Sequence, residues 1–179
     1  IRLHFLDAYL NFQKKEASWL KKGVNKPVDL PQDASEIRFS PIALDRIFYL
    51  IACLKAEGVY VNLDLQCSFY GYRNGTAPSG YPKDAENAKI QMFISEKFRK
   101  NYAAGTKKLL NTVNPYTGLA LKDEPAVAML CFYNEQDILL DHRNYGKEFH
   151  PAYVRFLKDK YGTPEAMNKA WKTNFPSFE

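Results

Sequence analysis

The segment from Pro125 to Gln136 constrains the fold of this chain more than any other part of the sequence. Residues 126–133 read AVAMLCFY, an apolar run without a charged side chain. Such a run is typical of a strand buried on both faces, as in a parallel sheet that is surrounded by helices. The run ends on Asn134 and Glu135, which places an amide and a carboxylate at the carboxyl end of the predicted strand.

Two further strands are predicted, over residues 1–6 and 59–66, because their polar and apolar residues alternate. Ser40 and Pro41 have the residue types of a helix N-cap and first helical position, and Gly58 suits the end of that helix. Helical spacing also predicts helices over residues 12–22, 85–113, 151–161 and 164–171. The order of strand, helix, strand, helix, strand and helices indicates parallel strands with right-handed crossovers.

The strand over residues 59–66 has two different faces. Its odd-numbered positions are apolar, and its even-numbered positions are Tyr60, Asn62, Asp64 and Gln66. In a (β/α)8 barrel the apolar face would meet the helices and the polar face would line the interior toward the active site. We therefore predict an α/β fold of the (β/α)8 barrel type, in one domain over residues 1–179. Asn62 and Asp64 are expected to belong to a polar network inside the barrel rather than to the chemistry.

Charge and cysteine content exclude several classes of partner. The net charge is +5, but the basic residues are scattered among acids and form no basic stripe with interleaved aromatic residues, so no nucleic-acid binding is expected. No run approaches the roughly 18 apolar residues of a membrane span. The three cysteines show no metal-ligand spacing, so no metal site is predicted. Buried free thiols are expected at Cys53 and Cys131.

Several stretches of the chain resemble clan A glycoside hydrolases. They are residues 2–7 (RLHFLD), residues 58–65 (GVYVNLDL) and residues 114–118 (NPYTG) through to Asn134 and Glu135. The similarity looks closest to family 5 cellulases and mannanases, and residues 156–171 also resemble family 42 β-galactosidase-like barrels. The resemblance implies that the three strands are the second to fourth of a (β/α)8 barrel. About half of that barrel would be present, with the remainder in the same or another chain.

The resemblance also implies hydrolysis of β-linked glycosides or polysaccharides by a retaining mechanism with two carboxylates and no metal or organic cofactor. Glu135 would be the acid/base, and Asn134 would bind the 2-hydroxyl of the sugar. Arg2 would orient the nucleophilic carboxylate, and His4, on the same face, would contact substrate or the carboxylates. The clan's nucleophile is a glutamate on the seventh strand, so it is expected outside these residues.

Other residues are expected to bind the carbohydrate substrate. Gln66 takes the position at which relatives often carry a histidine. Tyr70 and Tyr72 lie in an aromatic loop with Phe69 and Tyr81, whose rings would stack on sugar faces or would instead pack locally. Two alternatives stay open: a catalytically inactive carbohydrate-binding barrel, and a half-barrel scaffold that pairs with itself or a partner. Sugar specificity, endo or exo action and the cellular compartment are not determined by the sequence.

Overall fold

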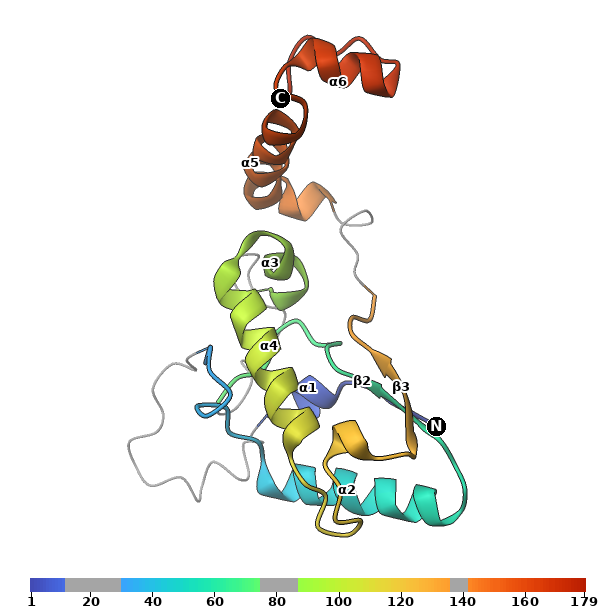
Figure 1. Cartoon of the computed structure of the whole chain (residues 1–179). Helices are drawn as coiled ribbons and strands as arrows, with labels where there is room; N and C mark the ends of the chain where they lie inside the picture. Colours follow the sequence, from blue (N-terminus) through green and yellow to red (C-terminus); the bar gives the residue numbers. More distant parts are fainter. Residues whose placement is uncertain (12–29, 75–86, 136–141) are drawn as a thin grey trace, which may run out of the picture. The chain divides into compact units, whose positions relative to one another are not determined.

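The computed structural model describes residues 1–11, 30–74, 87–135 and 142–179 (Figure 1). The chain forms two compact units, residues 1–136 and residues 137–179. The first unit contains a three-stranded parallel sheet in the order β1-β2-β3. Its strands are β1 (Arg2–Leu3), β2 (Val61–Asp64) and β3 (Val127–Cys131). The prediction of three parallel strands is therefore confirmed.

Helices connect the strands, as parallel pairing requires. Between β1 and β2 lie α1 (Leu6–Tyr9) and α2 (Pro41–Ala56). Between β2 and β3 lie α3 (Ala88–Ile94), α4 (Glu96–Asn111) and a short 3₁₀ helix, η3 (Leu121–Asp123). This alternation brings the carboxyl ends of all three strands to one edge of the sheet.

The described residues form this small sheet with its helices and not a closed barrel. In the described part of the chain β3 pairs with β2 alone, so it is an edge strand. Met129 within β3 is 61% exposed and Phe132 just after it is 58% exposed. The prediction of a strand buried on both faces was wrong here, because an apolar run alone does not determine whether a neighbour covers it.

The first two strands are shorter than the alternation predicted. Phe5 adopts a positive φ of 56°, which turns the chain into α1 and ends β1 after Leu3. β2 covers four residues, with an irregularity in its pairing to β3 between Val61 and Asn62. Hydrogen bonding to neighbouring strands, which the sequence does not show, sets these limits.

The ends of α2 follow the sequence signals. The Ser40 side chain accepts a hydrogen bond from the backbone N–H of Ala43 at 3.1 Å, and Pro41 occupies the first helical position. Beyond the helix, Gly58 has a φ of 71°, a left-handed conformation that glycine adopts without steric cost. Both predicted boundaries of this helix are confirmed.

The other predicted helices that fall on described residues are all confirmed, two of the predictions with different limits. The periodicity over residues 85–113 belongs to two helices, α3 and α4, which are separated at Ser95. The helix predicted from Pro151 begins earlier, because α5 (His142–Tyr161) contains Pro151 inside it, and α6 (Pro164–Trp171) has the predicted limits. The helix predicted over residues 12–22 lies outside the described residues.

The core of the first unit lies between β2 and the helices. Val61 and Leu63 of β2 and the following Leu65 are almost completely buried, as the predicted apolar face requires. They share one cluster with residues of α2, α4 and η3, including Ile47, Ile51, Leu109 and Leu121. Burial of apolar surface contributes roughly 25 cal/mol of stabilising free energy per Å², and this cluster therefore holds the sheet against its helices.

The second unit consists of α5 and α6. Val154 and Leu157 of α5 and Met167 of α6 are its buried apolar residues among those described. The indole N–H of Trp171 donates a hydrogen bond to the Tyr161 hydroxyl at 2.8 Å. No helix in the described part of the chain has an apolar stretch of the length needed to cross a bilayer.

Candidate active site at the carboxyl edge of the sheet

Asp64, the last residue of β2, lies at the centre of a polar cluster at the carboxyl edge of the sheet. Its side chain is completely buried. The Oδ2 atom accepts a hydrogen bond from Nε of Arg2 at 2.6 Å and lies in hydrogen-bonding contact with Nδ1 of His4. Burial raises the pKa of Asp64, but the hydrogen bonds from His4 and Arg2 outweigh it, so the pKa lies below its usual value. Asp64 is therefore held as a carboxylate.

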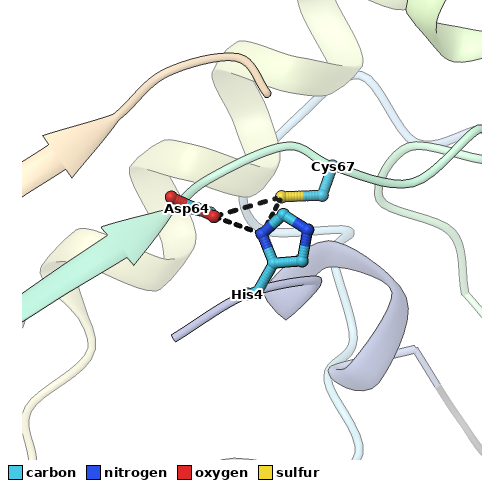
Figure 2. Close-up of side chains that lie close together, drawn as sticks. All are labelled: His4, Asp64 and Cys67. Atoms are coloured by element: carbon cyan, nitrogen blue, oxygen red, sulfur yellow. Dashed lines mark hydrogen bonds and ion pairs between the residues drawn. The ribbon is translucent and has the colours of Figure 1, made fainter. Parts of the chain in front are cut away.

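Cys67 completes this cluster from the loop after β2 (Figure 2). Its Sγ lies 3.4 Å from Nδ1 of His4 and 3.6 Å from Oδ2 of Asp64. Burial raises the pKa of the Cys67 thiol to about 12. The cluster thus combines a nitrogen, an oxygen and a sulfur atom within a small volume.

Asp7 of α1 fixes the loop that carries Cys67. Its buried carboxylate accepts hydrogen bonds from the backbone N–H groups of Cys67 and Ser68 and from the Ser68 hydroxyl, at 2.6–3.2 Å. Burial raises the pKa of Asp7 in spite of these hydrogen bonds. Because Asp7 also follows β1 closely, it ties the loop after β2 to the end of β1.

Asn134 joins the third strand to the same cluster. Its side-chain oxygen accepts a hydrogen bond from Nη2 of Arg2, and its backbone N–H donates to the carbonyl of Gln66 at 3.0 Å. Because a guanidinium only donates hydrogen bonds, the oxygen of the amide must face Arg2. The amide nitrogen of Asn134 is buried and has no hydrogen-bond partner among the described residues. This N–H donor is therefore available to a bound ligand.

Glu135 follows with an exposed side chain and a left-handed backbone, φ 51°. Its carbonyl accepts a hydrogen bond from Nζ of Lys89 at 3.4 Å. Lys89 is itself 8% exposed, and its ammonium group lies 4.9 Å from the centre of the Phe69 ring. A non-glycine residue in this conformation costs about 1–2 kcal/mol and recurs at functional sites.

Two tyrosines support the chain just before Asn134. The rings of Tyr102 and Tyr133 stack with centroids 4.9 Å apart, and the Tyr102 hydroxyl donates to the carbonyl of Phe132 at 3.1 Å. Burial raises the pKa of Tyr133 to about 12. α4 thereby holds the segment after β3 in place.

The structure brings some of the predicted site residues together and separates others. Arg2, His4 and Asn134 gather around Asp64. The Gln66 side chain is 1% exposed, and neither of its polar atoms has a partner among the described residues. Tyr70 is half-buried, and its carbonyl accepts a hydrogen bond from Nε of Arg73.

Tyr72 requires a correction. It is completely buried in the core, and its hydroxyl donates to the carbonyl of Leu65. Its ring therefore has no face open to a sugar, and local packing, the alternative left open for the loop aromatics, holds for this residue. Tyr81 lies outside the described residues.

Sequence reasoning placed Asp64 in a polar network inside the barrel rather than in the chemistry, and assigned no role to Cys67. The available signal for Asp64 was its position on the polar face at the end of a strand. Cys67 gave no signal, because its partners His4 and Asp64 come from two different strand ends and match no contiguous ligand motif. The expected burial of the other thiols also fails, since Cys53 is exposed and Cys131 is half-buried.

Comparison with protein families gives one match. The family model of the β-galactosidases of glycoside hydrolase family 42 matches residues 75–179, more than half of the chain. The match includes β3, Asn134, Glu135 and the second unit, and it is to family 42 rather than to family 5. Neither the curated proteins nor the solved structures gave a match. The chain belongs to the β-galactosidase family 42 of the glycoside hydrolases.

Proposed function

We propose that this chain carries the acid/base side of a retaining β-glycosidase that acts on β-linked galactosides or related glycosides and polysaccharides. Membership of the β-galactosidase family supports glycoside hydrolysis. The observation that carries the assignment of residues is the position of Asn134 and Glu135 just beyond β3, with two residues between its last residue and Asn134, at the carboxyl edge of a parallel sheet. In (β/α)8 enzymes catalytic groups come from this end of the strands.

Glu135 serves as the acid/base in this proposal. Its exposed carboxyl group protonates the glycosidic oxygen while the bond from the anomeric carbon to that oxygen breaks. A second carboxylate forms a covalent bond to the anomeric carbon in the same step. Glu135 then removes a proton from water, whose oxygen displaces the second carboxylate and releases the sugar with retained configuration.

Asn134 serves as a donor to the sugar 2-hydroxyl. Arg2 occupies the side-chain oxygen of Asn134, which leaves the buried amide nitrogen without a partner in the described part of the chain. A buried donor without an acceptor costs about 1–3 kcal/mol, and a sugar hydroxyl would satisfy it. The Arg2 contact thus favours a fixed orientation of Asn134 before substrate arrives.

The nucleophile is proposed to lie outside residues 1–179, in the remainder of a barrel supplied by the same or another chain. Asp64 is unsuited to the role because its side chain is completely buried and its Oδ2 atom already contacts Arg2 and His4. A retaining mechanism requires two carboxyl groups about 5–5.5 Å apart. The partner of Glu135 would therefore approach from the side at which its carboxylate is exposed.

The test is covalent trapping of the protein at its natural length with a 2-deoxy-2-fluoro-β-galactoside, followed by peptide mass spectrometry. The fluorine slows both steps, so the glycosyl-enzyme accumulates on the nucleophile. A label on a glutamate outside residues 1–179 supports the proposal, and a label on Asp64 or on Glu135 contradicts the assigned roles. A Glu96→Ala variant, which removes an exposed glutamate of α4, serves as the control and should label like the wild type.

A further inference from the structure

The cluster of His4, Asp64 and Cys67 is separate in chemistry from a two-carboxylate mechanism, which needs neither a thiol nor an imidazole. The ligand atoms of the three residues lie within 4.8 Å of one another (Figure 2). Imidazole nitrogen, carboxylate oxygen and thiolate sulfur are the three donor types that Zn²⁺ accepts in proteins. We propose that His4, Asp64 and Cys67 form a binding site for a zinc-like divalent cation.

The distances within the cluster suit tetrahedral coordination. Zinc bonds of about 2.3 Å to sulfur and about 2.1 Å to nitrogen or oxygen give tetrahedral edges of about 3.6 Å from sulfur and about 3.4 Å between nitrogen and oxygen. Sγ of Cys67 lies 3.4 Å from Nδ1 of His4 and 3.6 Å from Oδ2 of Asp64. Two of the three edges between the protein ligands are therefore already in place.

The third edge is occupied by the hydrogen bond between His4 and Asp64. A bound cation replaces the shared proton, and His4 has to move outward by about 0.5 Å or more, since a hydrogen bond is shorter than a tetrahedral edge. The His4 side chain is 35% exposed, so it has room to move and gives the ion a route into the site.

The carboxylate of Asp64 has capacity for the ion. Oδ2 is the oxygen that lies close to His4 and Cys67, and it also accepts the hydrogen bond from Arg2. A carboxylate oxygen has two lone pairs, so Oδ2 can keep Arg2 on one of them and offer the other to the ion, with Arg2 acting as the outer contact that orients the ligand. The Oδ1 atom is buried and has no hydrogen-bond partner among the described residues.

The protein ligands match the charge of the ion. Asp64 and a deprotonated Cys67 supply two negative charges against the two positive charges of the ion, and the thiol proton passes to solvent. The Arg2 guanidinium, which pairs with Asp64, leaves one positive charge beside the site. Three protein ligands leave a fourth position for water, as in zinc sites that exchange ligands. The proposal stands independently of the proposed glycosidase function, because it concerns binding of the metal alone.

Cobalt substitution of the tag-free, chelator-treated chain tests this proposal, since Co²⁺ adopts the zinc geometry and shows its sulfur ligands by absorption. We expect one Co²⁺ per chain, intense tetrahedral bands in the visible range and a sulfur-to-cobalt charge-transfer band, all displaced by Zn²⁺. Cys67→Ser should abolish the charge-transfer band. Cys53→Ser, which removes the exposed thiol of α2, should leave it unchanged.

A second pair of variants protects the test against misfolding of the buried Cys67 substitution. His4→Ala changes an exposed ligand and should weaken Zn²⁺ binding, measured by calorimetry, by about 100-fold. Loss of a residue that only contacts a metal ligand already lowers metal affinity by about 10- to 100-fold. His150→Ala changes an exposed histidine of α5 and should bind zinc like the wild type. Absence of the charge-transfer band in the wild type, its persistence in Cys67→Ser, or equal zinc affinity in His4→Ala and the wild type would overturn the proposal.

Discussion

Arg2 and Asn134 stand 132 positions apart in the sequence, yet the guanidinium of Arg2 donates a hydrogen bond to the side-chain oxygen of Asn134. The same guanidinium donates to Asp64 at 2.6 Å. One side chain from β1 therefore fixes the end of β2 and a residue in the segment after β3. The candidate site depends on this three-way connection more than on any single strand.

This connection predicts that Arg2 and Asn134 act as a coupled pair. Arg2→Met and Asn134→Ala should each lower the thermal unfolding midpoint, and the double variant should lose less than the sum of the two, because the first substitution already breaks the shared contact. Arg2→Met combined with Lys55→Met serves as the comparison, since Lys55 pairs with Glu124 in a separate salt bridge. Additive losses for Arg2 and Asn134 would contradict the geometry.

Asp64 predicts a specific acid dependence of stability. Its pKa is lowered in the folded protein, so its contribution is present above its unfolded-state pKa near 3.8 and is lost as pH falls through the lower, folded value. The free energy of unfolding can be measured with denaturant at neutral pH and near pH 3. Between these two pH values it should fall less for Asp64→Asn than for the wild type. Asp123→Asn, at an exposed site, should follow the wild type. If the free energy of unfolding fell by the same amount for Asp64→Asn and the wild type, this would be evidence against a charged, paired Asp64.

Glu135 allows stability and function to be separated at one position. Glu135 has a φ of 51°, which is strained for a residue with a Cβ atom. Glu135→Gly relieves this backbone strain, and Glu135→Ala retains it. We expect Glu135→Gly to be more stable than Glu135→Ala by about 1 kcal/mol in denaturant unfolding, because the cost of an L-residue is partly offset by the entropy of glycine. Both variants should lose the same catalytic function. A glycine variant less stable than the alanine variant would show that the backbone is not left-handed here.

Gly105 of α4 predicts a packing constraint on the core. A Cβ atom at this position would fall inside the van der Waals envelope of the Tyr72 ring. Gly105→Ala should therefore destabilise the protein by roughly 1–3 kcal/mol, although alanine is the better helix former. Replacing Tyr72 by leucine in the same chain should recover part of the loss. Calorimetric unfolding of the single and double variants measures this, and a more stable Gly105→Ala would place Tyr72 elsewhere.

Local sequence signals predicted much of the fold. Features that depend on contacts between distant segments could not be predicted. The Ser40 cap and Gly58 determine the ends of α2 through contacts within a few residues, so both boundaries could be predicted. The exposure of Met129 depends on which strands lie beside β3, and its apolar sequence does not reveal this.

The candidate site shows the same division. The Asn134–Glu135 pair was recognisable from its position after an apolar run. Asp64 was expected in a polar network, but its pairing with Arg2 was not recognisable, because an aspartate on a polar strand face has the same sequence pattern whether it is solvated or paired. Cys67 meets His4 only through the pairing of β1 with β2, which brings residues 63 positions apart into contact.

The central claim, that Glu135 is the acid/base, is tested most directly by a series of aryl β-galactosides whose leaving groups differ in acidity, using the protein at its natural length. For Glu135→Ala we predict a loss of about 10²- to 10⁴-fold in kcat/KM for poor leaving groups and little loss for the most acidic phenols, which depart without protonation. Added azide should speed turnover of Glu135→Ala and yield a β-galactosyl azide. The control variant Glu96→Ala should behave as the wild type. A uniform loss across the series with no azide product would contradict the assignment.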